Sequence, residues 1–465
     1  MPRCSRFFAV AFSILLILAP RAAMAQTDGP LYVVQPGDTL FAIALKFGTS
    51  VEALASANQI ADPSSIRPGM ELVLPGFEGI TGRLTTKAVG YGETLGSLTL
   101  RYGISPEVLV RLNRIVNPGR LYLGQEVILS EQDATQLLVP NSRLLLAEIG
   151  EGRLSFAVRR GLRPWSFWAD GASFFQAWAL PGRPFRVPGG ESPTGALPEP
   201  IQAVVVAPER AVQGRTLVVR LQLGEPALAA GRIGERQLTF HSLNSADLVT
   251  LQGIHALAEP GLYDLELALK DLDSGEILTR ISQPIRVAGG GYPADPILNV
   301  PDETVDPINT QPEDQMVAAL VTQSSEEKLW DGPFLFPTTY YETFSSFYGS
   351  RRNYNGLGYL WYHTGLDLFG STQTEVYAPA RGNVVFAGPL TVRGQATYID
   401  HGWGVFTGYF HQSQILVSVG DLVEVGQKIG MVGATGRARG AHLHWEVWVG
   451  GVPVDPLEWT TNPLP

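Results

Sequence analysis

The chain has 465 residues, of which 45% are hydrophobic and 17% are charged, with 51 glycines and 34 prolines. This length and composition favour several small, turn-rich globular domains and argue against a disordered chain. The formal net charge of -10 makes nucleic acid a poor partner, and the single cysteine, Cys4, excludes a disulfide within the chain.

An N-terminal segment, residues 1–25, has the pattern of a secretory signal peptide. Its first six residues include two arginines, residues 7–20 are predominantly apolar, and an A-x-A cleavage site ends at Ala25. The apolar run is shorter than the roughly 20 residues that a spanning helix requires, and no later segment of the sequence reaches that length. We therefore expect a secreted protein, periplasmic or cell-wall associated, without a transmembrane segment after signal cleavage.

Residues 31–75 and 86–130 repeat one another without a gap, at an offset of 86 − 31 = 55 residues. Each copy is predicted to form a strand, two helices and a second strand. The identical pairs under this offset include Gly37 and Gly92, Thr39 and Thr94, Leu40 and Leu95, Gly48 and Gly103, Ser50 and Ser105, Leu54 and Leu109, Asn58 and Asn113, Gly69 and Gly124, and Leu74 and Leu129.

The helix predictions follow from local patterns. In the first copy, apolar residues at 40, 43, 44 and 47 recur with the period of one helix face. Asp38 is placed to cap the start of this helix, and Gly48 can end it in a left-handed conformation. In the second copy, Ser105 and Pro106 suit a helix cap and the first helical position.

The two copies resemble LysM modules, on the GDTL pattern of residues 37–40 and the N...I-x-x-G-x-x-L-x-L pattern that ends at Leu74. The resemblance implies binding to the N-acetylglucosamine-containing glycans of peptidoglycan or chitin. In each copy the groove would lie between the first strand–helix loop and the last helix–strand loop. These loops are residues 37–40 and 66–69 in the first copy, and 92–95 and 121–124 in the second. The alternative is that Asp38 and Glu93 are only helix caps. The implied glycan-binding residues are Gly37, Asp38, Thr39 and Leu40 in the first copy, and Gly92, Glu93, Thr94 and Leu95 in the second.

The middle region, residues 150–288, consists of short apolar runs between turn signals. Alternating apolar residues at 262–269 and the turn-like sequence DLDSGE at 271–276 predict an antiparallel β-sandwich. The pattern resembles the immunoglobulin-like spacers of secreted bacterial proteins. His241 and His255 are interpreted as ordinary loop or strand residues. Residues 289–330, rich in Pro and Asp at their start, are predicted to be a linker with a short helix.

Five of the seven histidines fall between residues 363 and 444. His442 and His444 are two residues apart in a β-rich sequence, so a strand would project both from the same face. Two imidazoles and one carboxylate are the protein ligands of many catalytic zinc sites, which leave a fourth position open for water. Because the remainder of the chain has no cysteine after Cys4, a thiolate site is excluded and a nitrogen and oxygen site is favoured.

Residues 340–460 resemble the lysostaphin-type (LytM-like) zinc metallopeptidases, and we place this domain at 331–465. The resemblance rests on an H-x-x-x-D motif, a single histidine after a G-x-G-x-x-x-x-Y stretch, and an H-x-H motif. It implies an antiparallel β-sheet domain with zinc as cofactor. The implied zinc ligands are His363, Asp367 and His444, and the implied unliganded catalytic pair is His411 and His442.

Several details of this resemblance stay open. His401 is not one of the family's functional positions and is interpreted as structural. A tyrosine near the site often assists the oxyanion in this family, and here Tyr354, Tyr359 and Tyr362 are rivals. In latent members an upstream residue fills the fourth zinc position, and Asn309 is a conceivable candidate.

The sequence thus predicts a multidomain, mainly β protein with small α+β modules. Its predicted function is that of a secreted, zinc-dependent endopeptidase that cuts the peptide part of peptidoglycan and is held on the glycan by two LysM modules. The alternative is a catalytically inactive wall-binding activator of other peptidoglycan hydrolases. A D-Ala-D-Ala type carboxypeptidase is disfavoured, because its first His and Asp are about six residues apart, whereas His363 and Asp367 are four apart.

Overall fold

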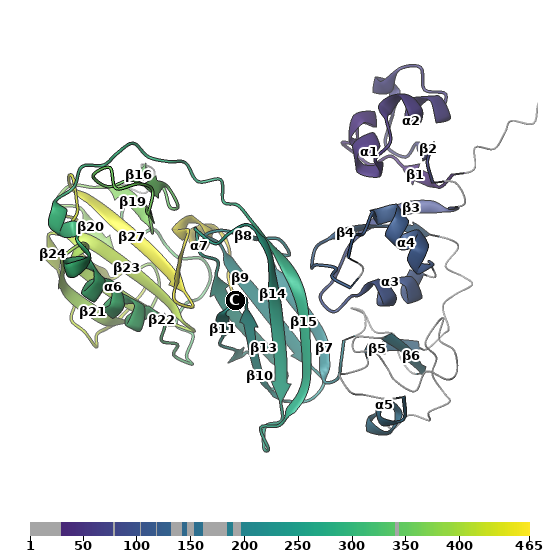
Figure 1. The fold of residues 1–465 in the computed structure, drawn as a ribbon. Coiled ribbons are helices and arrows are strands. Elements are labelled where there is room, and N and C mark those ends of the chain that lie inside the picture. The colour runs from purple at the N-terminus through teal and green to yellow at the C-terminus, as the bar shows by residue number, and fades with distance from the viewer. Residues whose placement is uncertain are drawn as a thin grey trace, which may run out of the picture. The chain divides into compact units, whose positions relative to one another are not determined.

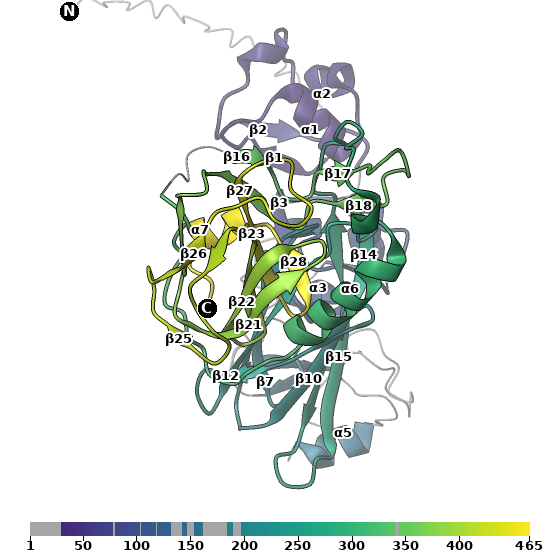
Figure 2. The same cartoon turned by 90° about the vertical axis from the view of Figure 1, so that its left-hand side faces the viewer.

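The computed structural model describes residues 29–77, 80–102, 104–117, 119–131, 142–146, 153–160, 184–188, 197–339 and 344–465. The predicted signal peptide lies outside these ranges. The described residues fall into two compact units, one of those up to residue 85 with residues 130 and 131, and the other of those in 86–129 and from residue 142 onward. The mainly β class with small α+β modules is confirmed (Figures 1 and 2).

The first LysM copy forms the predicted strand, two helices and strand. β1 pairs antiparallel with β2, with Tyr32 opposite Leu72. Apolar side chains of both helices and both strands are buried between them. The elements are β1 (Leu31–Val33), α1 (Leu40–Phe47), α2 (Val51–Ala57), the short 3-10 helix η1 (Pro63–Ser65) and β2 (Glu71–Val73).

The predicted cap of α1 is wrong by one residue. Thr39 is the N-cap, and its hydroxyl accepts a hydrogen bond from the Ala42 N–H at 3.1 Å. Thr39 is the last residue with extended backbone, so its short side chain reaches the first turn. Asp38 instead ties the preceding loop, because its carboxylate accepts from the Tyr32 hydroxyl and from the Gln35 N–H, each at 2.7 Å. Gly48 ends the helix at φ 63°, as predicted.

The second copy has the same internal fold around its own apolar core. Asn113 makes the same hydrogen bonds as Asn58 of the first copy. Each side-chain amide donates to one helix carbonyl and exchanges hydrogen bonds with the backbone of one residue in the last strand. Ser105 caps the second helix, as predicted. The elements are β3 (Arg83–Ala88), α3 (Leu95–Tyr102), α4 (Pro106–Asn113) and β4 (Glu126–Glu131).

None of the described helices has by itself the length and hydropathy of a membrane span; α1 and α2 reach them only when taken together, across a bend of 103°.

The middle region contains two sheets that enclose one hydrophobic cluster. One sheet has the order β11-β10-β14-β15-β8 and the other β12-β13-β9-β7. All pairings are antiparallel except that of β8 with β15. The strands are β7 (Ile201–Ala207), β8 (Ala211–Val212), β9 (Thr216–Leu223), β10 (Leu228–Ile233), β11 (Arg236–Leu238), β12 (His241–Ser242), β13 (Asp247–Gly253), β14 (Gly261–Lys270) and β15 (Ile277–Ala288).

These two sheets form a β-sandwich, while the comparison with immunoglobulin-like spacers stays a prediction. Ahead of it, an antiparallel pair of strands and a helix are described: β5 (Ser142–Leu146), β6 (Pro184–Pro188) and α5 (Arg153–Arg159).

The C-terminal domain is built on a sheet with the order β16-β19-β27-β23-β22-β21-β25, to which β28 adds beside β27. Smaller sheets β20-β26-β24 and β17-β18 lie in the same domain. The elements are β16 (Phe344–Ser346), β17 (Arg351–Arg352), β18 (Trp361–Tyr362), β19 (Leu366–Phe369), β20 (Glu375–Tyr377), β21 (Gly382–Leu390), β22 (Gly394–Gly402), β23 (Val405–Gln412), β24 (Gln414–Ile415), β25 (Leu422–Val423), β26 (Lys428–Met431), β27 (His442–Val449), β28 (Val452–Val454) and α7 (Pro456–Thr461).

The segment predicted as a linker packs against this domain. Its two helices are η3 (Asp302–Thr304) and α6 (Pro307–Val321). Val317 and Val321 of α6 pack on β22 and β23 in a separate apolar cluster, so that α6 covers one face of the sheet (Figure 1). Upstream of η3, Asp295 forms an ion pair with Arg352 at 2.8 Å. At 15 residues, α6 is longer than the short helix expected for this segment. The chain before η3 forms bridges from Ala294 to Arg351 of β17 and from Leu298 to Tyr354.

The sandwich also shares a core with the C-terminal domain. Val218, Val249 and Leu251 of the sandwich belong to the same buried cluster as Val447 and Trp445 of β27. The lone histidine His241 is buried here and stacks on Trp403, with ring centroids 5.1 Å apart. This contact gives His241 a packing role at the boundary between the two domains.

Candidate metal centre and active site

Strand pairing brings the predicted ligands together from distant parts of the chain. β19 lies antiparallel to β27, with Asp367 directly opposite His444 and Phe369 opposite His442. His363 lies just before β19, where its backbone N–H donates to the Ser350 carbonyl at 2.9 Å. Because side chains of paired residues leave a sheet on the same face, Asp367 and His444 point to a common position.

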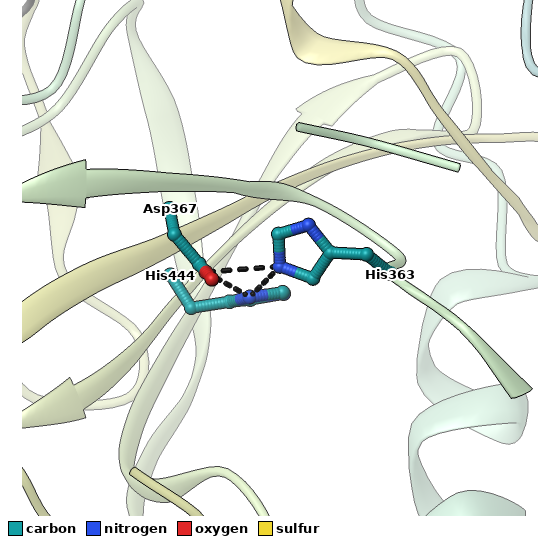
Figure 3. A group of neighbouring side chains, drawn as sticks. All are labelled: His363, Asp367 and His444. Atoms are coloured by element: carbon teal, nitrogen blue, oxygen red, sulfur yellow. Dashed lines mark hydrogen bonds and ion pairs between the residues drawn. The ribbon is translucent and has the colours of Figure 1, made fainter. Parts of the chain in front are cut away.

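Figure 3 shows the three side chains converging on one point. His363 Nε2 lies 2.9 Å from Asp367 Oδ1 and 3.0 Å from His444 Nδ1, and His444 Nδ1 lies 2.8 Å from Asp367 Oδ1. Ligand atoms about 2.1 Å from a tetrahedral zinc ion lie roughly 3.4 Å apart, so a small outward shift would fit the ion. Two imidazoles and a carboxylate are also a donor set that zinc accepts. The residues present therefore fit the metal.

The electrostatics of the three groups also favour a cation between them. Burial alone would lower the pKa of His444, but hydrogen bonds to Asp367 and Glu446 raise it to about 9. Burial is the main reason that the pKa of His363 is lowered. For Asp367, burial raises the pKa, yet attraction to His363 and His444 holds it well below its usual value. In the protein alone, a proton on His444 neutralises this carboxylate, and a divalent ion would take over that charge.

Surrounding groups orient the ligands. His363 Nδ1 lies 2.9 Å from the Phe347 carbonyl oxygen, so Nδ1 carries the proton and Nε2 keeps its lone pair for the metal position. His444 Nε2 lies 3.2 Å from Glu446 Oε1. Glu446 is 1% exposed and also bonds Thr364 and the Trp448 indole.

Glu446 was missed in the sequence, although a signal for it was present. Residues 442, 444 and 446 alternate along β27, so the strand periodicity that pairs the two histidines also places Glu446 on their face. A carboxylate on the outer nitrogen of a ligand histidine fixes the ring and raises its basicity. Glu446 therefore orients the His444 ring whose other nitrogen faces the candidate metal position.

The two predicted catalytic histidines lie beside the ligands. The rings of His411 and His442 are 4.8 Å apart, and the ring of His411 is 6.0 Å from that of His444. His411 Nδ1 lies 2.7 Å from the Thr435 carbonyl, and His442 Nδ1 lies 2.8 Å from the Gly440 carbonyl. Each Nδ1 thus donates a hydrogen bond to a carbonyl, which leaves each Nε2 with a free lone pair. Burial, helped by His444 and His442, lowers the pKa of His411 to about 3.

An open cleft of about 820 Å³ contains all five of these residues. Of the rival tyrosines, Tyr354 and Tyr362 line the cleft. The Tyr362 hydroxyl lies 3.2 Å from His255 Nε2, whereas the Tyr359 hydroxyl donates to the Asp295 carbonyl at 2.9 Å. The Arg437 guanidinium lies 4.2 Å from the ring centroid of Tyr354. Because the hydroxyls of Tyr359 and Tyr362 are bonded elsewhere, Tyr354 is the remaining candidate for the site.

Two other residues considered in the sequence lie elsewhere. His401 is 0% exposed, with Nδ1 2.8 Å from the Arg381 carbonyl and Nε2 2.8 Å from the Thr407 hydroxyl. Asn309 is exposed on α6 and lines a separate hollow with Glu313 and Leu390. Among the described residues, the one His, Cys, Asp and Glu group that could hold a metal ion consists of His363, Asp367 and His444.

The predicted glycan-binding residues have different surroundings in the two copies. In the first, Gly37 and Thr39 are exposed, Asp38 is half-buried and Leu40 belongs to the core. In the second, Gly92 is buried and Glu93 is 3% exposed, while Thr94 and Leu95 are half-buried. Glu93 is paired with Lys87 at 2.5 Å and with Arg101 at 2.9 Å.

Comparisons with known proteins agree with this architecture. Residues 361–456 match Peptidase family M23, and residues 32–75 and 89–130 match the LysM domain. The chain is 36% identical over 118 residues to the peptidoglycan DD-endopeptidase ShyB of Vibrio cholerae, which covers 25% of this chain and 28% of that protein. It is 42% identical over 95 residues to the DD-carboxypeptidase/endopeptidase Mpg of Neisseria meningitidis. The matched residues make up 20% of this chain and 22% of that protein.

Solved structures give similar matches. Lysostaphin of Staphylococcus simulans is 33% identical with a TM-score of 0.21, covering 21% of this chain and 43% of that one. A mutant catalytic domain of the prophage-encoded M23 protein EnpA of Enterococcus faecalis is 30% identical with a TM-score of 0.23, covering 27% and 95%. The chain spans about a quarter of the length of the two curated relatives. It contains two LysM domains followed by a peptidase domain of family M23.

Proposed function

We propose that this protein is a secreted, zinc-dependent endopeptidase that hydrolyses peptide bonds of peptidoglycan, at the cell wall or in the periplasm. The observation that carries the proposal is the convergence of His363, Asp367 and His444 at one point, with two further histidines beside them in an open cleft. The name of the Vibrio relative supports peptidoglycan as the substrate, and the names of the Vibrio and Neisseria relatives both support endopeptidase activity.

His363, Asp367 and His444 would hold the ion. When bound, zinc supplies Lewis acidity toward a carbonyl oxygen and makes hydroxide available near neutral pH. The residues of the chain contribute proton transfer and orientation. The Nε2 atoms of His411 and His442 keep a free lone pair when Nδ1 carries the proton, so either is placed to accept a proton from the attacking water. The same nitrogen can return that proton to the leaving amine as the C–N bond breaks.

Tyr354 is proposed to assist the oxyanion, because its side chain lines the cleft next to Arg437. Glu446 and the Phe347 carbonyl are proposed to hold the ligand rings in place. Glycan binding by LysM domains would keep the peptidase near its polymer and raise the local substrate concentration, to about the millimolar range for a suitable linker.

The alternative, an inactive activator of other hydrolases, is disfavoured by the intact chemistry of the site. All five side chains are present, and each of the two nonligand histidines has its Nδ1 on a carbonyl and its Nε2 free to accept a proton. A scaffold has no need for a carboxylate on the outer nitrogen of a ligand histidine, yet Glu446 is buried there.

The proposal is tested by incubating the purified protein with peptidoglycan sacculi and identifying the released fragments by mass spectrometry. We expect new amino termini, loss of activity after chelation, and recovery with zinc. Asp367→Asn should lower the rate by more than about 100-fold and reduce bound zinc, because it removes a ligand. Asp273→Asn, in the exposed turn between β14 and β15, is the matched control with unchanged rate. Full activity of Asp367→Asn, or no new amines from the zinc-loaded protein, would contradict the proposal.

A further inference from the structure

The two LysM domains differ at the loops that correspond to a glycan groove. Under the 55-residue offset of the repeat (86 − 31 = 55), Tyr91 takes the place of Pro36 and Leu123 the place of Pro68. Pro36 and Pro68 are exposed. Tyr91 and Leu123 are 3% and 4% exposed, and both belong to the hydrophobic cluster of the β-sandwich. The second module therefore presents apolar anchors where the first presents prolines to solvent.

These anchors attach the second module to β14 and β15. The Tyr91 hydroxyl donates to the Leu265 carbonyl at 2.6 Å. The Leu123 N–H donates to the Pro284 carbonyl at 2.9 Å, and Leu123 forms a β-bridge with Ile285. Because Leu265 lies opposite Gln283 in the pairing of β14 with β15, all of these contacts fall on one level of the sheet.

The side chain of Gln283 occupies the strand–helix loop itself. Its Oε1 accepts from the Gly92 N–H at 2.5 Å, and its Nε2 donates to the Gly90 carbonyl at 3.3 Å. One carboxamide thus uses a backbone donor and a backbone acceptor of the loop, which are groups that a sugar amide would otherwise bind. Gln283 is 4% exposed, so water does not compete for these bonds.

The space beside the loop is also filled. A Cβ placed on Gly92 would lie 2.4 Å from the side chain of Leu197, whereas a Cβ on Gly37 would meet nothing within 4 Å. The two glycines have nearly the same backbone conformation, with φ 87° and 88°. The loops thus share a shape and differ in what covers them.

We infer that the second LysM module docks on the β-sandwich through its glycan-groove loops, and that glycan is bound by the first module alone. This inference rests on the proposed function, in which a LysM domain holds the enzyme on glycan. It divides the repeat into a glycan-binding copy and a copy that closes one end of the sandwich core.

The experiment measures hydrogen exchange of the full chain with and without a soluble N-acetylglucosamine hexamer, together with binding stoichiometry by calorimetry. We expect one hexamer per chain. Exchange should slow at residues 35–40 and 66–70 on binding, while residues 90–95 should be protected already and unaffected by the hexamer. Two hexamers per chain, or new protection of residues 90–95 on binding, would overturn the inference.

Docking has a readout that does not depend on glycan. Gln283→Ala should speed exchange at residues 90–95 by at least about tenfold, because the Gly92 amide loses its acceptor. Gln237→Ala, an exposed residue of β11 in the same sheet, is the matched control and should leave exchange unchanged. Fast exchange at residues 90–95 in the unaltered chain would refute docking. If residues 90–95 exchange slowly but the chain binds no hexamer, docking holds and glycan binding is removed from the proposed function. The assignment of glycan binding to the first module is then removed as well.

Discussion

The two LysM modules have one internal design and two different surroundings. Asn58 and Asn113 make equivalent bonds, and Gly37 and Gly92 share one backbone conformation. The residues that repeat are those that each module needs in order to fold. The residues that differ at the groove loops face outward, where Tyr91 meets the sandwich core. A repeat thus preserves the fold of a module without preserving what the module contacts.

The two modules differ in the cooperative unit on which their stability depends. The first module belongs to a unit of its own, whereas the second belongs to the unit that contains the sandwich and the peptidase domain. All nine tryptophans lie after residue 160, so neither module contains one. The tryptophans of the described residues lie between Trp330 and Trp459, so their fluorescence reports on the unfolding of the larger unit. A change in the second module should move that transition because this module packs on the sandwich core.

The largest effect is expected from the two acidic residues of the loops. Glu93→Gln should lower the free energy of unfolding by about 2–3 kcal/mol, because it breaks a buried ion pair with two cations that stay partly exposed. Asp38→Asn should cost about 1 kcal/mol, in the first module only. Urea unfolding followed by tryptophan fluorescence should detect the first change and not the second. Equal shifts would show that the modules are coupled to the core alike.

A smaller effect, the difference between one alanine substitution in each module, isolates the crowding around the loop. Gly37→Ala and Gly92→Ala carry the same left-handed strain of about 1–2 kcal/mol, since their φ values match. Only Gly92→Ala also meets Leu197, which should add about 1–2 kcal/mol. Hydrogen exchange at residues 35–40 and 90–95 measures each module separately. If both alanines cost the same, the loop of the second module is open.

The five candidate site residues were more predictable than the groups that orient them. Histidines two residues apart on a strand, and a carboxylate four residues from another histidine, are local patterns that predict ligands. The pairing of β19 with β27 joins residues 77 positions apart (444 − 367 = 77), and only the family resemblance implied that convergence. Glu446 continues the alternation of β27 and could have been found by extending it. The Phe347 carbonyl carries no side-chain signal.

The fold was least predictable where tertiary contacts override composition. A Pro- and Asp-rich sequence predicts a linker, because it lacks the apolar period of a helix or strand. The structure instead ties this segment to the cleft through Asp295 with Arg352, and through the Thr304 carbonyl with Arg437. Single buried contacts of this kind leave no periodic pattern. The helix cap could not be predicted for a similar reason. Asp38 and Thr39 are both suitable N-cap residues, and the backbone conformation determines which of them takes that position.

The next prediction concerns one hydroxyl in each module. Tyr91→Phe should cost about 1 kcal/mol, because it removes the bond to the Leu265 carbonyl and keeps the buried ring. Tyr32→Phe removes the bond to Asp38 in the first module by a similar change. The tryptophan transition should shift for Tyr91→Phe alone. A shift for Tyr32→Phe would place the first module in the same cooperative unit and weaken the contrast between them.

The smallest effect should come from the exposed ion pair at the edge of the docked surface. Arg120 lies 2.9 Å from Asp264, but their side chains are 50% and 47% exposed. A double-mutant cycle of Arg120→Ala with Asp264→Ala should therefore give a coupling below about 0.5 kcal/mol. Raising the salt concentration screens such a pair and leaves the buried contacts of Tyr91 and Gln283 intact. Exchange at residues 90–95 that stays slow in high salt would assign docking to apolar packing and buried hydrogen bonds. Release of these residues by salt would assign it to charge.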